Sequence, residues 1–315
     1  MRFYVAVTDN DWFRHLADQP GIEEVNFWHP GSRNPVGSLP EGTPYLFKVK
    51  APYHHIAGGG YFTSYTRLPL PLAWDAFGTA NGVSSYREFS ERMVRLRRRD
   101  DELTPEIGCS ILRAPCFWPQ EHWIPADPVF SKNIVSGKGF DTRQADHAAL
   151  WQLIESRLRR CGNPTELVRE VDEIPSGYGN PTLVRPRRGQ GAFQALVTNA
   201  YQRRCAITGE STLPTLEAAH IRPVRFQGVN NTYNGLLLRA DFHKLFDRGL
   251  VTVTPQHRVV ISDRIKHEWF NGKAYYRLQG QELASLPAEL TDRPRADLLT
   301  WHNENVFERE VDHGQ

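Results

Sequence analysis

The spacing of apolar residues in the first half of the chain predicts short strands interspersed with helices. Segments rich in β-branched and aromatic residues are typical of strands and cover residues 2–8, 41–50, 56–68 and 107–118. Apolar residues at helical intervals predict helices over residues 12–18, 71–78 and 84–99. Three glycines, Gly58 to Gly60, loosen the third strand, so we expect a bulge or a close approach of two backbones. No strand is assigned to residues 19–40, and residues 123–141 have the composition of a loop.

The second half of the chain starts with helical spacing and then changes to Gly and Pro punctuation. Leu150, Ile154 and Leu158 predict a connecting helix over residues 142–161, and another helix is expected from about residue 190 to residue 202. The Gly- and Pro-rich run between them is the best linker candidate. We therefore divide the chain into residues 1–141, a helical and Gly/Pro linker over 142–184, and residues 185–315. The expected fold class is α+β.

A strand–turn–strand–helix pattern occupies residues 203–250. His220 ends a short apolar run, LEAAHI, and Asn234 opens a second one, NGLLL. His243 lies in ADFHKLFDR, whose apolar residues fall on one face of a short helix. These three sequence segments, in this order, resemble the HNH (ββα-metal) nuclease family in its bacterial restriction-type branch. After them we expect a strand pair over 251–262, a helix over 264–270, a strand over 273–280 and a helix over 296–307.

The chemistry of phosphodiester hydrolysis calls for the residue types in this pattern. It needs a base that activates water, a hard cation that stabilises developing negative charge, and a group that orients the base. A neutral imidazole suits the base because its ordinary pKa lies near working pH. The resemblance implies that His220 is the general base and that His243 holds a divalent metal. It also implies that Asn234 ties the two strands together and helps to position the base.

One departure from the family pattern concerns the metal ligands. Many HNH nucleases carry Asp immediately before the catalytic His, but here that residue is Ala219. Side chains alternate along a strand, so Glu217 is the nearest carboxylate on the face of residue 219. Asp247 lies four residues after His243 on the same helix face, where its alternative role is an ion pair at the helix end. We expect His243, with Glu217 or Asp247 and water, to bind Mg²⁺ or Mn²⁺; Ni²⁺, Co²⁺ or Zn²⁺ would also suit a His-dominated site in vitro.

Basic residues around the motif predict contacts with DNA phosphates. Arginines bracket the helix expected at 190–202, and their position beside a nuclease motif favours phosphate contact or groove insertion over a merely solvated charge run. The candidate contacts are Arg185, Arg187, Arg188, Arg222, Lys244 and Arg248. The expected partner is double-stranded DNA. Because HNH domains usually nick one strand, a double-strand break would need a homodimer or two binding events.

The N-terminal half carries a second, looser resemblance. The words TDNDWF, GTPYLFKV and IAGGGYF, in a unit of short strands and helices, resemble the PUA-like superfamily, which includes EVE, YTH and ASCH domains. The resemblance implies a small β-barrel with helices, in which some members bind a flipped modified base between aromatic planes and polar groups. The alternative is that these residues are core aromatics, a turn and a helix cap. The candidate pocket residues are Thr8, Asp9, Asn10, Trp12, Phe27 and Trp28.

The amino-acid composition excludes some classes of protein and leaves others open. A net charge of +2 over 315 residues excludes a wholly basic nucleic-acid coat but allows local basic faces. No apolar run is long enough to span a bilayer, so a soluble, cytoplasmic protein without membrane contact is expected. Cys205 has no CxxC neighbour that would support a structural zinc. All four cysteines are expected to be reduced thiols: Cys109, Cys116, Cys161 and Cys205.

Taken together, the two resemblances imply a modification-dependent restriction endonuclease. A reader of methylated or hydroxymethylated bases would raise the local concentration of DNA at a weak, nonspecific nuclease. Two alternatives stay open because a fold does not fix a function. The N-terminal half reads sequence, a phosphorothioate backbone or RNA instead, or the HNH fold is inactive and the protein only binds nucleic acid.

Overall fold

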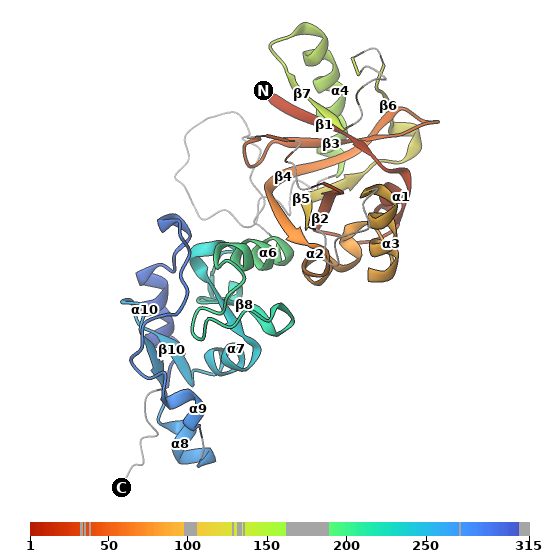
Figure 1. Cartoon of the computed structure of the whole chain (residues 1–315). Helices are drawn as coiled ribbons and strands as arrows, with labels where there is room; N and C mark the ends of the chain where they lie inside the picture. The colour runs from red at the N-terminus through yellow and green to blue at the C-terminus, as the bar shows by residue number, and fades with distance from the viewer. Residues whose placement is uncertain are drawn as a thin grey trace, which may run out of the picture. The chain divides into compact units, whose positions relative to one another are not determined.

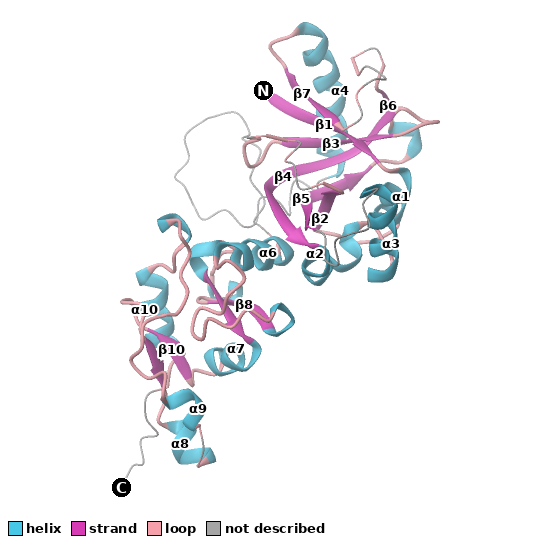
Figure 2. Cartoon of the chain, in the orientation of Figure 1, coloured by secondary structure: helices cyan, strands magenta, loops and turns pink. Residues whose placement is uncertain are grey.

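The computed structural model divides the chain into two compact units, Met1–Gly189 and Gln190–Gln315 (Figure 1). It describes residues 1–31, 34, 36–37, 39–97, 106–127, 129–130, 134, 136–161, 189–270 and 272–308. Both units mix helices with strands, which confirms the α+β class (Figure 2). The division into a reader, a linker and a nuclease stays a prediction, and most of the expected linker lies outside the described residues.

The first unit is built on one seven-stranded sheet. Its strands are β1 (Arg2–Thr8), β2 (Glu24–His29), β3 (Pro44–Val49), β4 (His55–Pro69), β5 (Glu106–Phe117), β6 (Ile124–Pro125) and β7 (Gly137–Asp141). Their order is β2-β5-β4-β3-β1-β7, with β6 on β4. Only β1 and β3 run parallel. Within the described residues the two end strands, β2 and β7, are not paired with each other, so the expected closed barrel is wrong: the sheet is open.

Long-range pairing creates strands where the sequence pattern shows none. β2 pairs with β5 over its full length, and β7 pairs with β1 through Gly137 to Asp141. The glycines of β7 and the polar residues of β2 hide the pattern, because strand formation depends more on neighbours than on intrinsic preference. The glycine prediction in β4 is confirmed: a Cβ at Gly58 would lie 2.2 Å from the Cys116 carbonyl oxygen, and the β4–β5 register shifts after Gly59.

Alternate residues of the sheet point into two separate cores. On one face, Tyr45 and Phe47 pack with Trp12 and Leu16 of helix α1 (Asn10–Ala17). On the other face, Phe3, Val5 and Leu46 pack with three residues of helix α4 (Ala145–Cys161), namely Leu150, Trp151 and Ile154. Helices α2 (Leu70–Phe77) and α3 (Tyr86–Arg97) complete the unit. The helix expected to connect two domains is therefore part of the first unit's core.

The cysteines differ from expectation at one position. Cys109 and Cys205 are buried free thiols, as expected, but Cys116 is disulfide-bonded. The expectation that all four cysteines are reduced is therefore wrong for Cys116. Among the described residues, no helix has the length and apolar character needed to cross a membrane.

The second unit contains two pairs of antiparallel strands and five α-helices among its described residues, besides short 3-10 helices. In chain order its elements are α6 (Gln190–Ala200), β8 (Leu216–His220), β9 (Gly235–Arg239), α7 (Ala240–Asp247), β10 (Val251–Val253), β11 (Val259–Ile261), α8 (Arg264–Trp269), α9 (Lys273–Tyr276) and α10 (Ala296–Asn305). The expected strand at 273–280 is wrong, because α9 forms there. Gly272, at φ 109°, turns the chain into this helix, and its carbonyl accepts hydrogen bonds from the backbones of Tyr275 and Tyr276.

The core of this unit joins both hairpins to the helices. Phe193 and Tyr201 pack with Leu236 to Leu238 of β9, and Phe242 and Phe246 of α7 lie in the same cluster. His302 of α10 stacks on Phe246, with ring centroids 3.7 Å apart. One nitrogen of the His302 ring lies 2.8 Å from Thr252 Oγ1 and the other 3.2 Å from the Phe246 carbonyl oxygen.

We predict that His302 makes the stability of this unit depend on pH. Burial lowers the pKa of His302 from 6.5 to about 4. Between these values the unfolded chain binds a proton that the folded chain excludes, so the contribution of the neutral ring is complete above about pH 6.5 and is lost as the pH falls toward 4. In urea unfolding between about pH 7 and pH 5, His302→Gln should reduce the slope by up to about 1.4 kcal/mol per pH unit.

The matched control is His267→Gln, because His267 is exposed. Some slope should remain in either variant, since burial also lowers the pKa of His29 in the first unit to about 4. Equal slopes for the wild type and His302→Gln would contradict the assignment.

Candidate active site

His220 stands at the end of β8, where the strand gives way to a long connection. Its backbone pairs with Gly235 of β9, and its ring lies parallel to Phe193 of α6, with centroids 3.9 Å apart. Its Nε2 lies 2.7 Å from Asn230 Oδ1. Because the amide oxygen accepts, Nε2 carries the proton, and the neutral ring then presents an unprotonated Nδ1. Nδ1 has no hydrogen-bond partner among the described residues, which leaves it available to take a proton.

The surroundings of His220 favour its neutral form. Burial lowers its pKa below 6.5, and the neighbouring His243 lowers it further. The bond to Asn230 and the charge of Asp247 act in the opposite direction. The balance lowers the pKa, so the ring is unprotonated at neutral pH, as a general base must be.

Asn234 acts on the backbone around the site and not on the His220 ring. Its side chain is fully buried, its Oδ1 accepts from the Arg222 amide at 2.9 Å, and its Nδ2 donates to the carbonyl oxygens of Arg222 and Val229. Its own carbonyl accepts from the Ile221 amide. These bonds close the connection that starts directly after His220.

His243 lies on α7 between two carboxylates. Its Nδ1 is 2.6 Å from Glu217 Oε2, and its Nε2 is 3.4 Å from Asp247 Oδ2. A neutral imidazole has one N–H, so it can donate to only one of these carboxylates. The other nitrogen then carries a lone pair, and the oxygen of the second carboxylate lies beside it.

This donor set fits a hard divalent cation in a particular way. Glu217 and Asp247 lie on opposite edges of one ring, so both cannot share one ion with His243 in this arrangement. In keeping with that, the described residues contain no cluster of three or more His, Cys, Asp or Glu side chains placed to hold a metal. One ring nitrogen and one carboxylate oxygen, completed by water and a substrate phosphate, form a set that Mg²⁺ and Mn²⁺ accept.

The residue before His220 is unsuited to metal binding. Ala219 is fully buried in the core of the second unit, whereas the Glu217 side chain is 49% exposed. A carboxylate at 219 would lie among apolar side chains. The burial of Ala219 thus gives a structural reason for carrying the acidic group two residues earlier.

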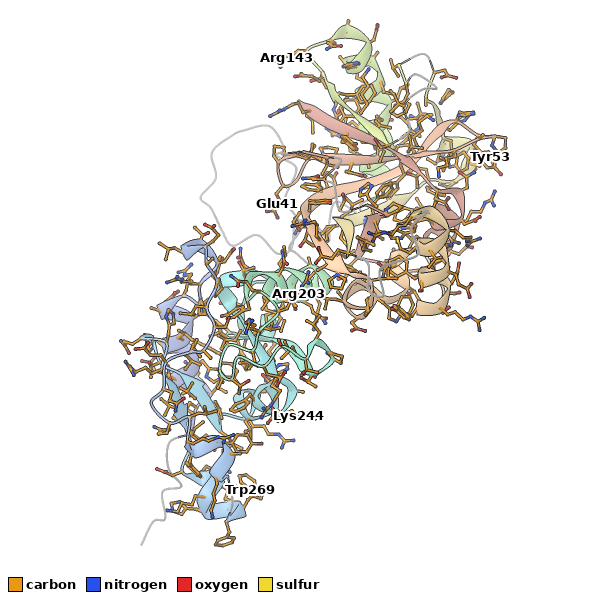
Figure 3. All side chains as sticks on the ribbon, in the orientation of Figure 1. Glu41, Tyr53, Arg143, Arg203, Lys244 and Trp269 are labelled. Atoms are coloured by element: carbon orange, nitrogen blue, oxygen red, sulfur yellow. The ribbon has the colours of Figure 1, made fainter. Side chains whose placement is uncertain are left out.

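The positively charged candidates are distributed unevenly. Arg185, Arg187 and Arg188 lie outside the described residues. Lys244 is exposed on α7 (Figure 3). Arg248 is exposed at the end of this helix. Arg222 holds its guanidinium 5.3 Å from the Trp301 ring centroid. The contacts of these residues with DNA stay predictions.

The aromatic candidates of the first unit are mostly core residues. Trp12 and Phe27 are 3% and 7% exposed and pack edge-to-face against each other. The Trp28 indole donates to the Asn81 carbonyl, and its ring packs on Phe89. In this structure Trp12 and Phe27 have no face open to a base, which does not support their use as stacking planes.

The polar candidates of the first unit also have local partners. Thr8 is buried and donates to the Ala6 carbonyl, while Asp9 caps α1 through the amides of Asp11 and Trp12. Asn10 accepts from the Lys50 amide. These contacts match the alternative of a turn and a helix cap, so the position of a base pocket stays a prediction.

Comparison with known proteins gives a family for part of the second unit. Residues 205–254 match the family model described as HNH endonuclease. The chain therefore carries an HNH endonuclease domain, and the protein is an endonuclease by this domain. Curated proteins provide no match to the sequence.

Two solved structures are similar over different shares of the chain. An ASCH protein from Zymomonas mobilis is 9% identical, with a TM-score of 0.32, over 47% of this chain and 93% of its own. The modification-dependent TagI restriction endonuclease is 13% identical, with a TM-score of 0.29, over 98% of this chain and 83% of its own. Both TM-scores are low, so neither likeness decides what this chain binds or cuts.

Asn230 is the site residue that the sequence pattern failed to single out. It lies in the connection between β8 and β9, four residues before Asn234, where no periodicity marks it. The available signal was the pair Asn230 and Asn231 near the motif, and only the fold of the connection brings Asn230 to His220.

We predict that Asn230→Ala lowers kcat for DNA cleavage about tenfold or more, with a smaller change in KM, because the His220 tautomer is no longer fixed.

Asn230→Asp adds a carboxylate that favours the imidazolium and raises the pKa of His220. The acid limb of the rate profile should then move to higher pH, because the base is lost earlier on acidification. Steady-state rates across pH test this, with Gln256→Ala, an exposed amide in the turn between β10 and β11, as the control. A purely structural Asn230 would leave the limb where it is.

Proposed function

We propose that this protein is a metal-dependent DNA endonuclease whose HNH site hydrolyses a phosphodiester bond. The observation that carries the proposal is the arrangement of His220, which has Nε2 held by Asn230 and Nδ1 available to accept a proton. His243 and its two carboxylates supply the cation-binding group on the adjacent helix. His243 lowers and Asp247 raises the pKa of His220, which supports placing the three residues in one site.

In this mechanism His220 Nδ1 takes a proton from the attacking water. Phe193 stacks on the ring and Asn230 holds Nε2, so the imidazole keeps its orientation as charge develops. A cation bound at His243 would stabilise the negative charge on the phosphate oxygens. Of the two ring nitrogens, we assign Nε2 and Asp247 to the ion, and Glu217 to the orientation of the ring through Nδ1–H. That division follows the usual pattern in which a metal-binding His donates its other N–H to a carboxylate.

We further propose that the first unit reads a modified base in double-stranded DNA, in the cytoplasm where such DNA enters the cell. The chain's division into a sheet unit and a nuclease unit supports a reader tethered to a cutter. A double-strand break would need two protomers or two successive events. The competing proposal of an inactive HNH fold is disfavoured because the base, its orienting amide and the His–carboxylate group are all present.

The substrate panel is the direct test of this function. Purified protein with Mg²⁺ or Mn²⁺ is incubated with matched DNAs that carry ordinary cytosine, methylated cytosine, hydroxymethylated cytosine or methylated adenine. We expect cleavage of one modified DNA, at least about tenfold faster than of the unmodified one, and no cleavage by His220→Ala. Equal rates on all DNAs would remove the modified-base reader and retain the nuclease.

The metal assignment predicts unequal effects of the two carboxylates. Asp247→Asn should raise the Mn²⁺ concentration for half-maximal cleavage about a hundredfold, and Glu217→Gln about tenfold, because Glu217 acts through the ring. Calorimetric titration of Mn²⁺ in the His220→Ala background measures binding independently of activity. Glu304→Gln, exposed on α10, is the control. A larger effect of Glu217→Gln would place the ion at Nδ1 instead.

A further inference from the structure

An aromatic and cationic groove lies beside the catalytic connection of the nuclease unit. It has a volume of about 450 Å³ and lies between the β8–β9 connection, including the short helix η4 (Val224–Phe226), and α10. The residues that line it are Arg222, Arg225, Phe226, Gln227, Trp301 and Asn305. This described lining contains two arginines and no carboxylate.

The two rings and the two guanidinium groups form one surface. The Phe226 and Trp301 rings are 5.5 Å apart, and Phe226 is 45% exposed. Arg222 lies over Trp301 and Arg225 over Phe226, at 5.3 and 5.0 Å from the ring centroids. The rings hold the guanidinium groups at the surface through cation–π contacts. Elsewhere in the unit, Arg258 and Arg295 are paired with carboxylates.

This surface is fixed to the catalytic residues through the backbone. Arg222 follows His220 by two residues, so their Cα atoms are within about 7 Å of each other. Both backbone polar groups of Arg222 bond to the buried side chain of Asn234. The groove therefore begins two residues along the backbone from His220, and Asn234 fixes its place beside the end of β8.

We propose that this groove binds a nucleotide next to the cleaved phosphate, with an unstacked base on Phe226 and Trp301 and its phosphate on Arg222 and Arg225. Exposed aromatic faces beside arginines bind single-stranded nucleic acid because every base has a π-face and every nucleotide a phosphate. The Phe226–Trp301 distance is too short for a base between the rings, so in this proposal the base packs against the exposed part of the Phe226 ring and the guanidinium beside it. This inference rests on the proposed DNA substrate and adds to it a preference for locally unpaired DNA.

The test uses the full chain with His220→Ala, in EDTA, and a labelled short oligothymidylate as the probe. Phe226→Ala and Arg225→Gln should each weaken binding about tenfold by fluorescence anisotropy. Arg225→Gln should also lower the slope of log affinity against log salt by about one. The matched controls are Phe270→Ala, at an aromatic residue that is 90% exposed, and Arg277→Gln, at an exposed arginine. Both lie elsewhere in the same unit and should leave binding unchanged.

Cleavage by the otherwise wild-type chain separates this proposal from the function on which it rests. If that chain cuts DNA and His220→Ala does not, the nuclease function stands. Unchanged affinity in Phe226→Ala and Arg225→Gln, or an equal loss in the controls, would then overturn the groove alone. If no DNA is cut but the two groove variants lose affinity selectively, the groove stands as a nucleotide site and the nuclease function fails.

Discussion

The nuclease unit depends on the hydrogen bonds made by one buried amide. Asn234 holds the amide and the carbonyl of Arg222 and the carbonyl of Val229, so it ties the start of the connection after β8 to its end before β9. A buried amide with all these bonds is costly to replace, because each backbone group would lose its partner without gaining water. Asn234 acts on the chemistry only through the backbone that it holds in place. The same closed connection carries Asn230 to the His220 ring and Arg222 to the surface.

The site combines groups with opposing electrostatic demands. A general base must be neutral, which burial of His220 against Phe193 promotes, whereas a cation site needs carboxylates, which favour protonated histidines. The fold meets the two demands at two different histidines, His220 and His243. Glu217 and Asp247 contact His243 on α7, while the partner of His220 is the uncharged Asn230. The amide orients the base without adding a charge that would raise its pKa as a carboxylate does.

Local signals predicted the elements whose structure depends on neighbouring residues, and failed where distant strands decide. The β8–β9–α7 arrangement could be predicted because turn residues and spacing indicate it. The three glycines from Gly58 also marked a close backbone approach, although not its distant partner, Cys116. Strand β2 was missed because Asn26 and His29 interrupt its pattern, and its pairing with β5 joins residues far apart in sequence. Asn230 was missed for the same reason, since its contact with the base exists only once the connection has folded. Trp12 shows the limit of such signals, because an aromatic residue after a strand is typical of a pocket and of a core alike, and the structure buries it in the core.

The two stacked histidines of this unit show why geometry, and not residue type, identifies the base. His220 lies on Phe193 and His302 on Phe246, with nearly the same ring separation, and burial lowers both pKa values. His302 is 2% exposed and has hydrogen-bond partners at both nitrogens, so it has no capacity to accept a proton from water. His220 has a hydrogen-bond partner among the described residues at Nε2 alone and keeps Nδ1 available beside the His243 group. The same aromatic stacking therefore supports a structural histidine in the core and a reactive one at the end of β8. What distinguishes them is one ring nitrogen that has no hydrogen-bond partner among the described residues.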